Sequence, residues 1–297
     1  MFQLIVLLSI VLFPIAMEAQ QRTVALTFDD PPAAGTMNRA EAASFNQAIL
    51  EALGRHKAPA TGFVIEQRLH VLGRPELLKK WVRRGHDLGN HTFSHADFNE
   101  LTVQQFKQEV IAGEAAITQA LGHRPRYFHF PENHTGDIQE KHDVMSEFLA
   151  ARGYTLAVCT IDNEDYLFNN AYAKILASKD AASVARLHRD YLAYTATEVD
   201  FYAGLHQQVF GREIPHVMLL HVNRLNADVI EEVLKIFERK KYRFVSLSDA
   251  LSDPAYKTSD TLAIKYGWMW GYRWARELGV KVNGSLEPEV PEWVLKY

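Results

Sequence analysis

Two carboxylates stand side by side at Asp29 and Asp30, directly after an apolar run and directly before two prolines. Successive side chains of a strand point to opposite faces, so adjacent acids can serve one site only where the strand is already turning. Aspartate before proline is also a common turn or cap pattern. Taken alone, the pair favours a turn, and a chemical role needs further residues.

Two imidazoles follow at His91 and His95. Histidines four residues apart converge on one ion if the chain makes a helical turn there. Surface histidines give the same spacing by chance, so this motif is a weak signal by itself. Combined with the carboxylate pair, it predicts a catalytic metal site. Two imidazoles and one carboxylate leave coordination positions open for water and substrate.

A third histidine, His221, ends the apolar run 217–220. A histidine in this position is more often a buried or rim residue whose hydrogen bonds are satisfied. A proton-transfer role is at least as well supported, because His221 would face the same rim as the metal residues.

Apolar runs rich in β-branched residues alternate with segments of helical period after residue 20. The expected strands are 23–29, 61–66, 87–91, 127–131, 154–162, 216–222 and 242–247. The expected helices are 40–57, 76–84, 102–121, 139–152, 227–240 and a long stretch from about 172 to 209. Such alternation predicts parallel strands with helical crossovers, hence an α/β barrel or a doubly wound sheet.

Sites in both folds gather at the C-terminal ends of the strands. The residues that could take part in catalysis meet this condition. The successive expected strands end at Asp29 and Asp30, His91, Pro131, Asp162 and His221.

Five motifs in order carry a resemblance to a known family. They are T-F-D-D at 27–30, H-T-x-x-H at 91–95, F-x-F-P at 128–131, D-x-x-D-Y at 162–166 and L-x-H at 219–221. Together they resemble the polysaccharide deacetylase family, with its NodB homology domain (carbohydrate esterase family 4-like), over roughly residues 22–250. The resemblance implies a distorted (β/α) barrel with about seven parallel strands. It also implies a metal-dependent hydrolase that removes N-acetyl groups from an N-acetylated polysaccharide or oligosaccharide.

The resemblance implies a role for each matching position. Asp29 resembles the general base that activates the attacking water. Asp30, His91 and His95 resemble an Asp-His-His metal set, usually zinc in this family, with cobalt as the alternative. His221 resembles the general acid that protonates the leaving amine.

Three further positions follow from the same resemblance. Asp165, or alternatively Asp162, resembles the carboxylate that orients His221. Tyr166 stands where the family usually has tryptophan and is expected to line the acetyl pocket. The backbone amide of Glu132 is expected to hold the oxyanion.

Three positions depart from the family pattern. Pro31 replaces a glycine, Glu132 replaces an aromatic or apolar residue, and His129 replaces an arginine that pairs with the base carboxylate. One hypothesis is that His129 keeps Asp29 ionised and makes activity more sensitive to pH. The other is decay to a carbohydrate-binding protein with little catalysis. The complete ligand and acid/base set favours the enzyme. A further alternative is the same barrel acting on a non-sugar amide or an ester.

Length, composition and net charge limit the class of protein to which the chain can belong. The chain has 297 residues, 47% of them hydrophobic, and a formal net charge of -4. It can bury a large core, and without a basic face it is not expected to bind nucleic acid. Its single cysteine, Cys159, excludes an intramolecular disulfide. Nothing in the sequence indicates an oligomeric state.

The first 19 residues are predicted to be a signal peptide. Their apolar run is short for a bilayer span, although the absence of Lys and Arg leaves an uncleaved anchor as the alternative. Either reading predicts a secreted or periplasmic protein, without stable membrane insertion after cleavage. Residues 20–252 are expected to form the deacetylase-like domain, and 253–297 a C-terminal extension packed on the barrel.

Overall fold

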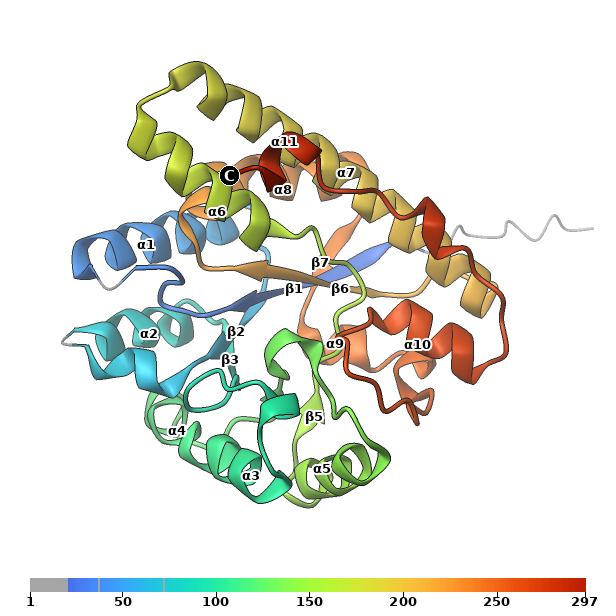
Figure 1. The fold of residues 1–297 in the computed structure, drawn as a ribbon. Coiled ribbons are helices and arrows are strands. Elements are labelled where there is room, and N and C mark those ends of the chain that lie inside the picture. Colours follow the sequence, from blue (N-terminus) through green and yellow to red (C-terminus); the bar gives the residue numbers. More distant parts are fainter. Residues whose placement is uncertain (1–20, 37, 72) are drawn as a thin grey trace, which may run out of the picture.

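A parallel sheet lies at the centre of the computed structural model, which describes residues 21–36, 38–71 and 73–297, and helices surround it (Figure 1). In this part of the chain the strands are β1 (Thr23–Asp29), β2 (Ala60–Val64), β3 (Asp87–Asn90), β4 (Tyr127–Phe128), β5 (Thr155–Leu156), β6 (His216–His221) and β7 (Arg243–Val245). Their order is β5-β4-β3-β2-β1-β6, and β7 also pairs with β1. Every pairing among these strands is parallel.

The chain beyond β5 brings the two edges of the sheet together. Ile161 forms a parallel bridge with Met218 of β6, and its carbonyl accepts from the Leu219 amide at 2.9 Å. The predicted strand 154–162 is therefore shared, because its first part pairs with β4 and its last part with β6. This contact makes the sheet a distorted barrel, and the predicted fold class is confirmed.

Helices cover the outside of the sheet. Those in the described residues are α1 (Arg39–Arg55), α2 (Arg74–Arg83), α3 (Val103–Ala112), α4 (Ala115–Leu121), α5 (Gln139–Ala151), α6 (Asp165–Ser178), α7 (Ala181–Phe210), α8 (Arg224–Arg239), α9 (Leu247–Leu251), α10 (Trp270–Glu277) and α11 (Glu292–Leu295). The main core joins the inner faces of α1, α2 and α8 to β1 and β6, with Phe28, Trp81, Leu220 and Phe237 fully buried. Burial of this size holds the strand ends in place.

The predicted helix 102–121 is wrong, because the chain forms two helices, α3 and α4, that separate at Gly113. A Cβ at Gly113 would lie 2.5 Å from Asn90 Oδ1 and 2.8 Å from the Thr92 carbonyl carbon. The break lets the backbone approach the end of β3 closely, which only glycine permits.

The predicted long helix 172–209 is also two helices, α6 and α7. Lys179 between them adopts the left-handed conformation at φ 58°, and the Asp180 carboxylate caps α7 by accepting from the Ala182 and Ser183 amides. The sheet strand predicted at 127–131 is shorter than expected, since the chain leaves the sheet after Phe128 and enters a 3₁₀ turn at Pro131.

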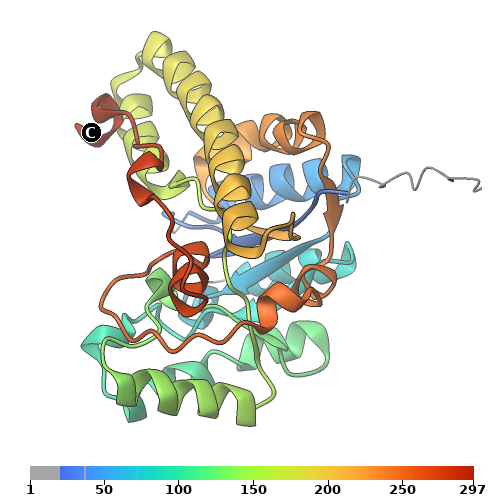
Figure 2. The same cartoon turned by 90° about the vertical axis from the view of Figure 1, so that its right-hand side faces the viewer.

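Residues 253–297 first pass α5 and the turn at 131–133, where Asp260 contacts His142 and Gly267 lies against Glu132, and then run along α7 and α6 (Figure 2). In α10, Gly271 packs so closely on α7 that a Cβ there would lie 2.7 Å from Leu205 and 2.9 Å from His206. Trp274 of α10 is 1% exposed, so part of this segment belongs to the buried structure.

The predicted signal peptide lies outside the described residues and stays a prediction. Among the helices of residues 21–36, 38–71 and 73–297, none combines the length and the hydropathy that crossing a bilayer requires.

Candidate active site

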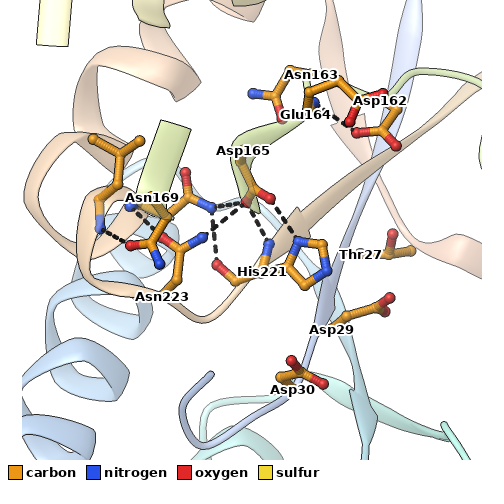
Figure 3. Close-up of polar contacts among 12 residues, drawn as sticks. Thr27, Asp29, Asp30, Asp162, Asn163, Glu164, Asp165, Asn169, His221 and Asn223 are labelled. Atoms are coloured by element: carbon orange, nitrogen blue, oxygen red, sulfur yellow. Dashed lines mark hydrogen bonds and ion pairs between the residues drawn. The ribbon is translucent and has the colours of Figure 1, made fainter. Parts of the chain in front are cut away.

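The two adjacent aspartates reach one site because β1 turns between them. Asp29 is the last residue of β1 and pairs in register with His221 of β6. Asp30 has φ 68°, in the left-handed region, and its amide donates to the Phe63 carbonyl at 2.9 Å. This conformation carries the second carboxylate around to the ligand group that also contains His91. Figure 3 shows both aspartates below His221.

The histidine motif converges without the helical turn that its spacing would otherwise need. Left-handed residues at Thr92 (φ 69°) and His95 (φ 63°) bend the chain instead, and the two imidazole centroids are 4.8 Å apart. The bend is held by Glu109 of α3, whose carboxylate accepts from the backbone and hydroxyl of Ser94 at 2.8 and 2.9 Å. Gly113, where α3 and α4 separate, lies against Thr92 and is therefore directly behind this bend.

His91 presents an unprotonated nitrogen to the site. Its Nδ1 donates to the His129 carbonyl at 2.9 Å, and burial lowers its pKa to about 4, so the ring is neutral. The other nitrogen, Nε2, is buried without a hydrogen-bond partner among the described residues and lies 3.3 Å from a carboxylate oxygen of Asp29. Two lone pairs that face each other in a buried site favour a bound cation.

Asp30 also keeps one oxygen free. Its Oδ2 forms an ion pair with Arg68 Nη1 at 2.6 Å, whereas Oδ1 is buried with no hydrogen-bond partner in the described part of the chain. Because Arg68 occupies one carboxylate oxygen, the other is left for a ligand. The free atoms of Asp30 and His91 lie beside His95, and suitable donor atoms of the three residues are within 4.8 Å of one another.

His129 pairs with Asp29 rather than offering a ligand atom. Its Nδ1 donates to Asp29 at 3.0 and 3.2 Å, and its Nε2 faces Asn133 Oδ1 at 3.0 Å and Cys159 Sγ at 3.4 Å. Burial would lower the pKa of His129, but Asp29 outweighs it and holds this pKa well above its ordinary value. A doubly protonated ring has no lone pair for a metal.

Asp29 is ionised for the same reason. Burial alone would raise the pKa of its carboxyl, yet the charged imidazole of the neighbouring His129 holds it well below the usual range. Asp29, His91 and His129 form a second geometrically possible ligand group. The protonation of His129 disfavours it, so Asp30, His91 and His95 are the residues that fit a divalent cation.

A histidine–aspartate pair lies on the other side of Asp29. His221 Nδ1 donates to Asp165 Oδ1 at 2.6 Å, and the second oxygen of Asp165 accepts from the His221 amide at 2.7 Å (Figure 3). The side chains of Asn223 and Asn226 donate to that same oxygen. Burial opposes a charged imidazole, but Asp165 outweighs it and raises the pKa of His221 to about 10.

Asp162, the alternative partner for His221, has a different environment. One of its oxygens accepts from the Glu164 amide at 2.9 Å. Burial, with the nearby Glu164 carboxylate, raises its pKa to about 7. Of the two candidates, Asp165 therefore makes the hydrogen bonds to His221, and Asp162 lies on the pocket wall.

One pocket of about 570 Å³ brings most of these residues together. Seven of the nine residues expected at a site line it, namely Asp29, Asp30, His95, His129, Glu132, Tyr166 and His221. The other two, His91 and Asp165, lie behind Asp29 and His221 and contact them.

Glu132 has φ 56°, so the 3₁₀ turn after Pro131 bends sharply at the pocket wall. Tyr166 is 47% exposed, and its ring edge meets His221.

Sequence reasoning missed three contributors. Arg68 pairs with Asp30 from the 3₁₀ turn after β2, and Asn133 lies beside His129. Asn226 of α8 donates to Asp165. Arg68 and Asn133 lie in irregular turns, and Asn226 lies in the first turn of a helix. The hydrophobic periodicity of the sequence does not predict side-chain contacts in such places. For Asn226, its place three residues after the capping Asn223 was the available indication.

Comparison with known proteins agrees with this geometry. A family model described as polysaccharide deacetylase matches residues 16–148. A chitooligosaccharide deacetylase from Sinorhizobium fredii is 33% identical over 173 residues, which are 56% of this chain and 71% of that protein. The chain belongs to the polysaccharide deacetylase family.

Other relatives in this family are longer or more distant. The peptidoglycan-N-acetylmuramic acid deacetylase PdaC of Bacillus subtilis is 25% identical over 232 residues, 78% of this chain but only 39% of that protein. Among solved structures, a family pseudoenzyme from Bacillus anthracis superposes with a TM-score of 0.55 at 14% identity, covering 78% of this chain and 66% of that one. The structural likeness shows the shared deacetylase fold, and the activity has to be argued from the site.

Proposed function

We propose that this chain is a divalent-metal-dependent hydrolase that removes N-acetyl groups from an acetylated saccharide, outside the cytoplasm as residues 1–19 predict. One observation carries the proposal. A buried, ionised Asp29 lies between a cation-binding set and the His221–Asp165 pair, within a single pocket. The relatives named as chitooligosaccharide and peptidoglycan deacetylases support the substrate class.

Zinc is the proposed metal. Two imidazoles and one carboxylate suit Zn²⁺ in a catalytic site that keeps positions open, and Co²⁺ accepts the same ligands. The chemistry that such an ion supplies when bound is polarisation of the acetamide carbonyl and a lower pKa for water.

Asp29 is suited to act as the general base. It is ionised, buried and held by His129, so its carboxylate can take a proton from a water as the water oxygen attacks the acetyl carbon. The sharp turn at Glu132 lies on the same pocket wall, where the resemblance places the amide that stabilises the oxyanion.

His221 is suited to act as the general acid. The imidazole is charged below its raised pKa of about 10, with Asp165 fixing its orientation through Nδ1. When the C–N bond breaks, the electron pair passes to nitrogen, and His221 protonates that nitrogen from Nε2. The products are a free amine and acetate.

A substrate panel tests the proposed reaction. Zinc-loaded protein is expected to release acetate and free amine in equal amounts from N-acetylglucosamine oligomers. Acetate without amine from O-acetylated sugars would move the assignment to an esterase, and turnover of cyclic amides alone would move it away from sugars. Oligomer binding without any turnover would favour the alternative in which the chain, with His129 in place of arginine, is a carbohydrate-binding protein that has lost catalytic activity.

Replacing Asp165 with asparagine is expected to move the alkaline limb of the kcat/KM profile to lower pH by about 1–3 units. His221 donates a proton only when charged, so activity is lost as pH rises through its pKa. Asp165 is what raises that pKa. The pH dependence of acetate release measures the shift. Asp162→Asn is the matched control and is expected to move the limb much less. Equal shifts in the two variants would contradict the assignment of Asp165.

Replacing His129 with glutamine is expected to move the acidic limb of kcat/KM to higher pH by about 1–3 units. Asp29 acts as a base only when ionised, so activity is lost as pH falls through its pKa. Without the His129 cation, burial dominates and this pKa rises. His129→Arg restores a permanent cation and is expected to keep the acidic limb low. An unmoved limb in His129→Gln would show that His129 does not hold Asp29 ionised.

A further inference from the structure

The C-terminal segment reaches the pocket at Gly267. Gly267 lines the cavity, and a Cβ at this position would overlap the Glu132 carbonyl oxygen. Two residues before Gly267, the carbonyl of Lys265 accepts a hydrogen bond from Asn99 Nδ2 at 2.7 Å. The backbone at Gly267 is therefore packed tightly against the turn that forms one wall of the site, and only glycine allows so close an approach.

Two large aromatic residues flank this glycine and remain exposed. Tyr266 is 68% exposed and Trp268 is 44% exposed. The Trp268 amide donates to the Tyr266 carbonyl at 3.0 Å, so the chain turns tightly between them. Trp270 and Trp274, a few residues later, are instead 6% and 1% exposed. Packing of the core accounts for the last two and leaves Tyr266 and Trp268 unexplained.

The pocket that Gly267 lines carries polar and aromatic side chains of the kind that bind sugars. The amide side chains of Asn133, Asn169 and Asn170 contribute to it, and Tyr166 adds a third half-exposed aromatic ring. Amides donate to and accept from hydroxyl groups, whereas flat aromatic rings cover the apolar C–H faces of pyranose rings. At about 570 Å³, the cavity has room for more than one pyranose ring.

We propose that Tyr266 and Trp268 form a stacking subsite for a sugar unit adjacent to the one that is deacetylated. The C-terminal segment then contributes to the binding of substrates that are longer than one sugar unit. This inference rests on the proposed function and extends it to substrate length. It assigns the binding of neighbouring sugar units to the C-terminal segment, which lies outside the part of the chain that the family model matches.

The test compares substrates of increasing length. For wild type, kcat/KM for acetate release is expected to rise from N-acetylglucosamine to its dimer and tetramer. Trp268→Ala is expected to lower kcat/KM for the tetramer by about tenfold, and Tyr266→Ala by several-fold, as for loss of one stacked ring. Trp268→Phe is expected to recover most of the loss. Tyr297→Ala, an exposed aromatic residue at the C-terminal end, is the matched control and should behave as wild type.

Binding is measured separately, so that failure of the subsite and failure of the proposed function can be told apart. The zinc-loaded protein is titrated with the tetramer while tryptophan fluorescence is followed, with calorimetry for the Trp268 variants. Weaker tetramer binding in Trp268→Ala and Tyr266→Ala supports the subsite even if no acetate is released, an outcome that would count only against the deacetylase assignment. Equal affinity for monosaccharide and tetramer, or variants that bind the tetramer as wild type does, would overturn the subsite.

Discussion

Replacing Asp29 with asparagine is expected to lower kcat for acetate release by roughly 10³-fold while the protein still binds its metal. Asparagine has nearly the same shape but cannot accept a proton from water. The change leaves Asp30, His91 and His95 untouched, so the ligand set remains complete. Acetate release and bound metal are measured on the same preparation, the latter by elemental analysis.

The control for this variant is the same substitution at the opposite end of the barrel. Asp87 begins β3 and pairs with Arg126, far along the strand from the catalytic rim. Asp87→Asn is expected to keep wild-type turnover. Activity within about tenfold of wild type in Asp29→Asn would mean that another group serves as the base.

Replacing His91 with alanine is expected to remove both the metal and the activity. His91 supplies the buried, unprotonated Nε2, and it is the residue shared by both geometrically possible ligand groups near Asp29. Loss of one of three ligands should reduce metal affinity by well over 100-fold, since even changes to residues behind the ligands cost about 10–100-fold. A competition titration with a chromophoric chelator gives the affinity, and acetate release gives the activity.

An exposed histidine serves as the comparison for His91. His123 lies on the surface, where its Nδ1 donates to the neighbouring Arg124 carbonyl at 2.9 Å. His123→Ala is expected to bind one metal ion with unchanged affinity. If His91→Ala still bound a stoichiometric ion and remained active, the ion would have to lie elsewhere in the protein.

Much of the site could be predicted because it follows from parallel strands. Asp29 and His221 end neighbouring strands whose C-terminal ends share one rim, and the apolar runs that define those strands are plain in the sequence. The expected condition for adjacent aspartates, a strand already turning, is met by the left-handed Asp30. The strand periods and the rule that parallel strands place their C-terminal ends on one rim were therefore enough to bring the acid and base candidates together.

The parts that escaped prediction depend on contacts between distant segments. The bend at 91–95 uses left-handed Thr92 and the carboxylate of Glu109 rather than a helical turn, and no local pattern signals this. The helix break at Gly113 exists because the end of β3 lies against it. Arg68 meets Asp30 from an irregular turn. Such features require the tertiary structure, since a single glycine inside a helical pattern is tolerated and does not by itself predict a break.

Removal and restoration of the metal tests the central claim most directly. The protein is stripped with a chelator, and acetate and free amine are measured with N-acetylglucosamine tetramer before and after one equivalent of zinc is returned. We expect no release from the stripped protein and equal release of acetate and amine once zinc is restored. Full release from metal-free protein, or none from protein that holds one zinc ion, would contradict the assignment of this site as a metal-dependent deacetylase.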